Sequence, residues 1–308
     1  MSARRRAGVI VLVAGAILLI LFGFFLTGRF PQEPLRRALE SRLQQGLGAG
    51  SSVGSVRLVP GRLQIEMRDL VLVGPTYKLV APRVFVVAKM DFLLGRSLSF
   101  RVVQAESARL TLRPSPTAQP KKPLLAQPLM IDTLELTGAT IVYEGTEDIG
   151  RVVVRGVDAR GSIGHGALEI ALEGGSWTRG TPLDFQQGHG LLRVSSDLDI
   201  TIDSLDMRTA RSRLHTTGRL GVLGMLAPDL QVDATLDLRE AAHFRAQPAM
   251  SGTVDVKGRL KYTDRFALDA YVQGQGLRVD KWAIDRVAGS VKHGVEGAER
   301  TRLDLQAG

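Results

Sequence analysis

The sequence contains no cysteine and no asparagine, has few lysines and is poor in aromatic residues. Without cysteine the chain cannot form disulfide bridges, thiolate zinc sites or a cysteine nucleophile. Aromatic residues make up 5% of the chain, which argues against the aromatic girdles of a transmembrane barrel. The shortage also favours flexible aliphatic chains over flat rings as ligands.

Only eight lysines are present, so arginine supplies most of a net charge of +9. A basic chain can bind nucleic acid or anionic lipid. Here the arginines are spread along expected strands and do not cluster with aromatic residues. We therefore predict solvated sheet faces and no nucleic-acid partner, with attraction to anionic lipid headgroups as the alternative. The 308 residues, 44% apolar and 23% charged, suit one large or two modest globular domains.

The N-terminal segment carries an uncharged, mostly apolar run over residues 7–27. As a helix it spans about 30 Å, the thickness of a hydrocarbon core. Arg4, Arg5 and Arg6 precede it, which favours a cytoplasmic N-terminus and an exported remainder. A cleaved signal peptide is the alternative, but its apolar core is shorter and ends in small residues. The run therefore predicts an uncleaved transmembrane anchor.

A short helix is expected next, over residues 34–47. Pro34 suits a first helical turn, and Gly46 and Gly48 end the pattern. Leucines at a spacing of four residues would form one stripe on this helix. They are Leu35, Leu39, Leu43 and Leu47.

From about Val53 the hydrophobic period changes from helical to two, as in strands with one apolar face and one wet face. Glycine and proline turns recur every 10–15 residues or so, which favours antiparallel meanders. Residues 114–128 break the alternation with five prolines and predict an extended linker or loop. The predicted organisation is therefore an anchor over 1–29, a helix and first β-segment over 30–113, this linker, and a continuing β-segment over 129–308.

So many one-sided strands, with almost no helix to cover them, must pack as two sheets or curl as one. A curled antiparallel sheet would form an open hydrophobic groove that acyl chains could fill. The fold class predicted is mainly β, with this taco-like groove, and a tethered β-sandwich without a lipid conduit is the alternative. The residues predicted to line the groove are Leu63, Ile65, Met67, Leu134, Leu136, Ile141, Leu198, Ile200, Ile202, Val232, Ala234, Leu236, Val254, Val256 and Leu268.

Catalytic, cofactor and metal motifs are not apparent, so we predict a protein that is not an enzyme. The five histidines show no ligand spacing. The glycine-rich residues 161–166 lack the lysine of a phosphate loop and predict a hairpin turn. Asp197, Asp199, Asp203 and Asp206 lack the central glycine of a calcium loop and predict the wet face of a strand.

Several segments, taken in their order along the chain, resemble segments of the AsmA-like superfamily, most closely the N-terminal part of the TamB proteins. After the anchor and the helix come residues 54–58 and 63–72, then 81–84 and 91–96 leading into 98–113. Residues 131–143 resemble a segment that recurs in this superfamily. The resemblance extends over nearly the whole chain.

This resemblance implies a periplasmic β-groove anchored in the bacterial inner membrane. It implies roles in moving phospholipid toward the outer membrane and in assembling or secreting outer-membrane proteins with an outer-membrane barrel partner. TamB-like chains are much longer, and this sequence ends at Gly308 inside an alternating pattern, so we expect a fragment.

Overall fold

The computed structural model is mainly β and describes residues 32–47, 49–59, 64–89, 98–113, 128–145, 150–179, 181–223, 225–241, 250–262, 266–294 and 302–307. The helices are α2 (Gln32–Leu47) and α4 (Leu238–Ala241). The first strands are β1 (Ser52–Val59), β2 (Gln64–Val73), β3 (Tyr77–Ala88), β4 (Leu98–Glu106), β5 (Arg109–Leu112), β6 (Leu129–Glu144), β7 (Arg151–Ile163) and β8 (Ala167–Arg179). The remaining strands are β9 (Thr181–Val194), β10 (Asp199–Thr209), β11 (Arg213–Val222), β12 (Met225–Asp237), β13 (Met250–Tyr262), β14 (Phe266–Val279), β15 (Trp282–His293) and β16 (Arg302–Ala307).

The predicted anchor lies outside these described residues, as do the proline-rich residues 114–127 and Leu63. Within the described part, neither helix has the length and apolar character needed to cross a membrane. The predicted membrane span is therefore untested by the structure.

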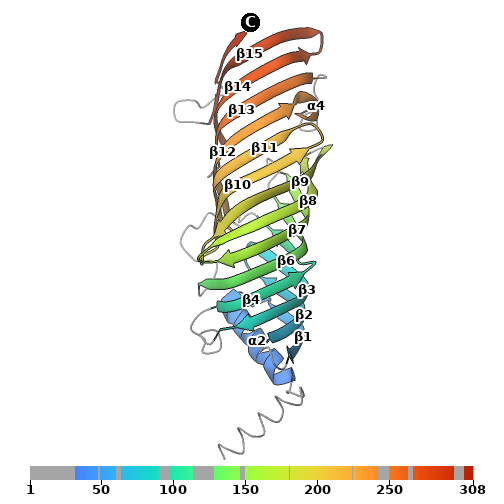
Figure 1. The fold of residues 1–308 in the computed structure, drawn as a ribbon, viewed down its shortest axis with the longest axis vertical. Coiled ribbons are helices and arrows are strands. Elements are labelled where there is room, and N and C mark those ends of the chain that lie inside the picture. The colour runs from blue at the N-terminus through green and yellow to red at the C-terminus, as the bar shows by residue number, and fades with distance from the viewer. Residues whose placement is uncertain are drawn as a thin grey trace, which may run out of the picture.

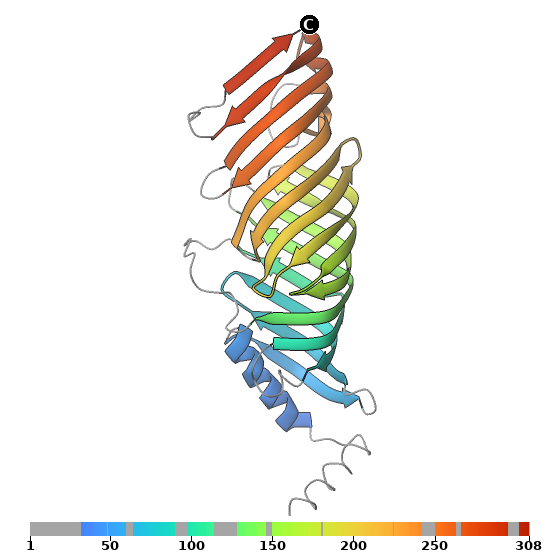
Figure 2. The ribbon, with the colours of Figure 1, turned by 60° about the vertical axis from the view of Figure 1, so that its left-hand side comes forward.

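The described strands form one long sheet and not two packed sheets. Figure 1 shows the strands stacked in chain order, from β1 beside α2 at one end to β15 near the other. Figure 2 shows the strands bending so that the sheet curls about its long axis. The expected meander is confirmed for most of the chain, because hairpin follows hairpin from β6 to β16.

The expectation of a wholly antiparallel sheet is wrong at one place. Strands β4 and β5 lie end to end, and both pair with β6 in parallel. Leu98 is opposite Leu129, and Leu112 is opposite Tyr143. A parallel pair needs a long crossover connection, whereas a hairpin needs only a short turn. The proline-rich residues fall between β5 and β6, where this crossover is required.

Helix α2 confirms the helix expected over residues 34–47 and begins two residues earlier, at Gln32. Leu39 and Leu43 from its apolar stripe are buried in the core, and Leu35 packs against them. Arg36 and Gln44 donate hydrogen bonds to backbone carbonyl oxygens of the β1 region. The helix is thereby held against the first strands of the sheet.

One apolar face continues across the sheet from end to end. Directly opposed residues on neighbouring strands point to the same face. One unbroken series of opposed residues, the apolar row, contributes one residue from each strand except β5. Its members are Val56, Met67, Val84, Ala105, Leu136, Ala159, Ile170, Gly190, Leu205, Thr216, Val232, Gly258, Ala270, Val291 and Leu303.

Thr216 is the polar member of the apolar row, and its hydroxyl donates to the Gln231 carbonyl oxygen at 2.8 Å. Glycines in the row permit close approach between strands. A Cβ on Gly258 would lie 2.4 Å from the Ala270 Cα. Because glycine has no side chain to hold the neighbouring strand away, the backbones approach closely and the sheet can bend at this position.

Burial changes along the apolar face. The described part contains 30 buried apolar residues, and only Ile202, Ala234, Ala270 and Leu277 of these lie in β10–β16. The two core clusters of buried residues lie between α2 and β9. The same apolar face is therefore enclosed over the first strands and more open over the later ones.

Candidate functional site

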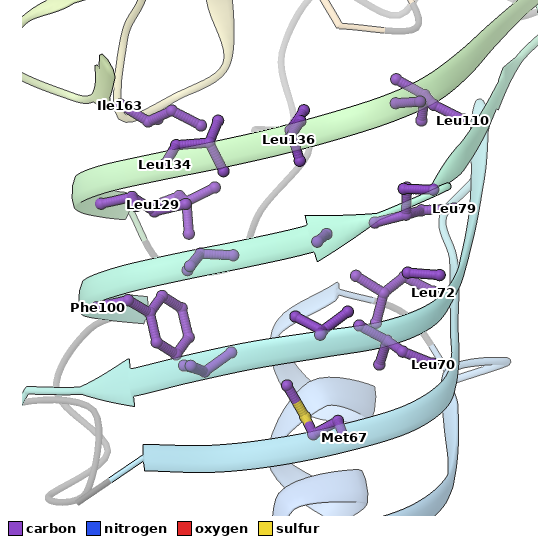
Figure 3. A pocket seen from close by; sticks show the side chains of 18 of the residues that line it. Met67, Leu70, Leu72, Leu79, Phe100, Leu110, Leu129, Leu134, Leu136 and Ile163 are labelled. Atoms are coloured by element: carbon purple, nitrogen blue, oxygen red, sulfur yellow. The ribbon is translucent and has the colours of Figure 1, made fainter. Parts of the chain in front are cut away.

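The enclosed part of the apolar face contains a cavity of about 310 Å³. Its described lining residues come from α2, from β2 to β7, from the link between β4 and β5, and from two turns farther along the chain. Figure 3 shows side chains such as Leu134, Leu136 and Ile163 projecting into it. The lining side chains are hydrocarbon apart from the Met67 thioether and the hydroxyls of Tyr77 and Thr140. We call this cavity the chamber.

The lining residues of the chamber are Leu39, Leu43, Ile65, Met67, Leu70, Leu72, Tyr77, Leu79, Ala81, Val84, Val86, Ala88, Leu98, Phe100, Val103, Ala105, Ala108, Leu110, Leu129, Ile131, Leu134, Leu136, Ala139, Thr140, Ile141, Val157, Ile163, Leu198 and Leu223.

Helix α2 closes the chamber beside β1 and β2. Leu39 and Leu43 are each 7% exposed and form part of the lining. Their spacing of four residues places both side chains on the same face of the helix. The helix also carries ion pairs of Arg36 with Glu33 and Glu40, at 2.8 and 2.9 Å. The leucine stripe thus performs the covering role for which its spacing is suited.

Two turns from farther along the chain complete the lining. Leu198 lies between β9 and β10, and Leu223 lies between β11 and β12. The Leu129 amide at the start of β6 donates to the Ser196 carbonyl oxygen at 2.9 Å. This hydrogen bond joins β6 to a turn that lies beyond β7 and β8 in the sheet order. The sheet therefore curls back on itself at this edge.

The structure brings six of the predicted groove residues together in the chamber. They are Ile65, Met67, Leu134, Leu136, Ile141 and Leu198. The prediction that Leu198 is a strand residue is wrong, because Leu198 precedes β10 and has a φ of 63°. The other described candidates lie on later strands and do not line this cavity. They are Ile200, Ile202, Val232, Ala234, Leu236, Val254, Val256 and Leu268.

These later candidates still share the apolar face with the chamber. Val232 belongs to the apolar row, and Ala234 is opposite Val256. Val256 is in turn opposite Val272, and Leu260 is opposite Leu268. Leu236 is 38% exposed, which reflects the more open character of this part of the sheet.

The opposite face of the sheet is charged, and its ion pairs cross from strand to strand. Near α2, Glu66 is buried and accepts hydrogen bonds from Arg68 and Arg83 at 3.1 and 3.0 Å. Burial raises the pKa of Glu66, but the two arginines lower it by more, so the carboxyl group's pKa lies below its ordinary value. Glu66 is therefore ionised at neutral pH.

Similar pairs continue along the charged face. Arg160 and Gln104 hydrogen-bond to Glu135 and lower its pKa. Farther on, Arg259 makes a two-armed contact with Asp229 and lowers the pKa of that carboxyl group. Each acid is stabilised as an anion by a neighbouring strand. These carboxylates are therefore held as ion-pair partners of arginines on the charged face.

Of the acidic residues predicted to form a wet strand face, Asp199, Asp203 and Asp206 lie on β10 as expected, but the prediction is wrong for Asp197, which lies in the turn before β10. Asp199 pairs with Arg219 at 3.0 Å, and Asp203 pairs with Arg193 at 2.6 Å. The described residues contain no cluster of three or more acidic or histidine side chains able to hold a metal ion. The glycine-rich residues 161–166 form the end of β7 and the turn at 164–166 that leads into β8, which confirms the predicted hairpin.

Two histidines that are distant in the sequence flank one aspartate. His215 Nδ1 lies 2.9 Å from Asp206 Oδ1, and His189 Nε2 lies 3.7 Å from Asp206 Oδ2. The three residues stand side by side on β9, β10 and β11. Their sequence spacing gives no hint of this grouping, because it depends on strand register.

Sequence reasoning missed most of the chamber wall. The lining residues of β3 and β4, including Val84, Val86, Phe100 and Val103, were not among the candidates. The alternation of apolar and polar residues in β3 is incomplete, because Val86 and Val87 are adjacent. Register against β2 identifies the inward residues, since Ile65 is opposite Val86.

Comparison with models of known protein families gives no match to this chain. A search of curated proteins likewise gives no match.

Proposed function

We propose that this protein is an inner-membrane-anchored, periplasmic protein of the AsmA-like type that conducts phospholipid toward the outer membrane. The apolar row carries this proposal, because it provides an apolar face on successive strands from β1 to β16. A chain of stacked strands with one such face offers a path along its length. Acyl chains are the ligand whose chemistry fits that path.

The chemistry of the chamber favours hydrocarbon. Its walls are aliphatic with few rings, and its two hydroxyls are the polar groups of the lining side chains. Burial of a methylene group contributes about 0.8 kcal/mol, so a chain of several methylenes gains substantial free energy there. A charged headgroup gains nothing from these walls and belongs in solvent at the edge of the sheet.

The position of the chamber in the chain supports loading at the membrane. Helix α2 starts at Gln32, five residues after the predicted anchor ends at Thr27. Five residues of extended chain reach at most about 18 Å. The chamber end that Leu39 and Leu43 cover is therefore held close to the membrane surface in which the anchor is proposed to sit.

Outer-membrane protein assembly or secretion, with an outer-membrane barrel partner, is the second part of the proposal and rests on the family resemblance. Assembly clients with exposed apolar strands could use the same face. The proposal includes no catalytic step and no cofactor.

Photocrosslinking in living cells tests the proposal directly. Crosslinkers at Ile200 and Val256, on the apolar face, are expected to capture phospholipid. Crosslinkers at Asp199 and Asp255, the preceding residues on the same strands, serve as matched controls. Capture of phospholipid from the control positions alone would refute a conduit on the apolar face. Capture from none of the four positions would instead favour a tethered scaffold.

A charge on the path gives an independent functional test. Ile200→Asp is expected to block phospholipid transport while the anchor remains inserted, because the charge must be desolvated by each passing acyl chain. Thr201→Asp places the same charge one residue away on the same strand and is the control. Thermal unfolding of both variants separates a block in transport from a loss of folding.

A further inference from the structure

The turn between β9 and β10 contains a backbone conformation that its sequence does not favour. Four described non-glycine residues have positive φ, and Leu198 is the one with an aliphatic side chain. Its φ of 63° lies in the left-handed region, which costs an ordinary L-residue about 1–2 kcal/mol. Asp69, Ser107 and Asp280 are smaller polar residues in the same region. Backbone strain at a bulky residue is a reason to look for a function at that position.

The Leu198 side chain is directed into the chamber. It is 7% exposed and contributes to the lining together with Leu223 from the next turn along this edge. Helix α2 lies at the β1–β2 end of the lining, and these two leucines come from β9–β12. Leu198 therefore lines the chamber from the segment that leads directly into β10 and the later strands.

Backbone hydrogen bonds fix this turn on several sides. The Leu198 amide donates to the Ser195 carbonyl oxygen at 3.0 Å, and the Leu223 amide donates to the Leu198 carbonyl oxygen at 2.9 Å. The bond from the Leu129 amide to the Ser196 carbonyl oxygen adds a contact with β6. A residue with unfavourable φ persists only when its surroundings determine it in this way. We call residues 195–198 the strap.

We infer that the strap is a restriction between two compartments of the apolar face and that Leu198 is its stopper. The inference rests on the proposed function, because the occupant to be restrained is the acyl chain of a phospholipid. A chain held in the chamber meets Leu198 at the side opposite α2. Passage to the apolar face of β10–β16 requires the Leu198 side chain to move aside.

The substitution Leu198→Gly separates the stopper from the turn. Glycine adopts a φ of 63° without strain, so the strap is expected to keep its conformation while the side chain is removed. Asp280→Gly is the matched control, because Asp280 has a φ of 55° in the turn between β14 and β15. Both variants relieve backbone strain, and only Leu198→Gly opens the chamber.

A thiol-labelling experiment measures the opening without any lipid. The natural chain has no cysteine, so Leu136→Cys places a single reporter in the chamber wall. Adding Leu198→Gly is expected to speed reaction of this thiol with a small maleimide by about tenfold, equal to about 1.4 kcal/mol in the barrier. Adding Asp280→Gly should leave the rate unchanged. An unchanged rate in folded Leu198→Gly protein would refute the restriction.

Crosslinking in the full chain then tests the restriction on the ligand. Photocrosslinkers at Leu136 in the chamber and at Val256 beyond the strap report phospholipid in each compartment. Leu198→Gly is expected to raise capture at Val256 relative to Leu136, and Asp280→Gly is not. Capture at Leu136 with an unchanged ratio overturns the restriction and leaves lipid binding intact. Absence of capture at both positions in the natural sequence overturns the proposed function together with this inference.

Discussion

The two ends of the sheet share one alternation of apolar and polar residues, but they differ in how far their apolar face is covered. The proximal region, residues 32–194, contains both core clusters, the covering helix α2 and all of the chamber lining except Leu198 and Leu223. The distal region, residues 199–307, continues the same alternation, but most of its apolar side chains are half-buried. Leu236, Trp282 and Ile284 are more than one-third exposed there. Alternation therefore specifies which face is apolar, and other features of the chain decide whether that face is covered.

The largest expected loss of stability comes from a charge placed in the proximal region, and the same charge in the distal region serves as the comparison. Leu134→Asp is expected to destabilise the fold by about 4 kcal/mol or more, because the carboxylate is buried among hydrocarbon with no partner. Val256→Asp is expected to cost only about 1 kcal/mol, since its side chain is half-buried on the open part of the face. Urea unfolding followed by hydrogen exchange measures both losses strand by strand. Equal losses would remove the distinction between the regions.

Truncation of the buried leucine side chains on the covering helix is expected to cause the next largest loss of stability. Leu39→Ala and Leu43→Ala should each cost about 2–3 kcal/mol, because each leaves a void where a buried leucine closes the chamber. Arg42→Ala changes an exposed residue of the same helix and should stay within about 0.5 kcal/mol of the natural chain. Hydrogen exchange of the α2 amides and denaturant midpoints give the comparison. Loss of protection in all three variants alike would show that α2 is held by its polar contacts.

The buried carboxylate Glu66 gives the proximal region a pH dependence. Its pKa is lower in the folded chain than in the unfolded one, so it stabilises the fold above the ordinary carboxyl pKa of about 4.5. That contribution is lost as pH falls through the lowered folded-state value. Glu66→Gln should cost about 1–2 kcal/mol at pH 7 and should flatten the fall in stability below about pH 5.

Glu106→Gln, on the same face of the proximal region, is the control for this pH profile. Glu106 is exposed and should change stability by less than about 0.5 kcal/mol. Thermal unfolding midpoints of both variants and of the natural chain, measured between pH 3 and 7, show whether Glu66 causes the loss of stability in acid. A natural profile retained in Glu66→Gln protein would assign the acid sensitivity to other carboxylates.

The smallest expected effect lies on the charged face of the distal region. Asp229→Asn removes one partner of the Arg259 pair, whose arginine side chain is 64% exposed. Solvent screens such pairs, so the loss should be no more than about 0.5 kcal/mol and should shrink further at high salt. Salt titration of the unfolding midpoint checks this. A loss above about 1 kcal/mol would indicate that the charged face contributes more to the distal region than its open apolar face does.

The sequence predicted the apolar face better than the enclosure. Alternation in the segment with Val254 and Val256 determines which side chains share a face, because the side-chain period of a strand is two. The stripe with Leu39 and Leu43 likewise predicted the helix, while its covering role was one of two alternatives, beside a place on the membrane surface. Both are local patterns, and local patterns are visible in a single sequence.

The chamber itself depends on contacts that no local pattern contains. The parallel joint of β4 and β5 with β6 brings Val103 opposite Leu134. The curl of the sheet brings Leu198 and Leu223 to the same cavity. Glycines such as Gly258 permit curvature, but their spacing does not say how far the sheet will turn. The sequence thus predicts which face of the sheet a side chain lies on, but it does not predict whether that side chain lines the chamber.

The parallel joint also has a consequence for how the chain folds. Each hairpin from β6 onward pairs residues close in sequence, so little chain entropy is lost when it closes. Pairing of β4 and β5 with β6 must close a longer loop that returns the chain to the start of β4 before it gains any contact. We expect the strands on either side to form first and the joint to form late. Pulse-labelling exchange would then show the Ala105 and Leu136 amides protected after those of β13 and β14, and the chamber completed only when two preformed stretches of sheet meet.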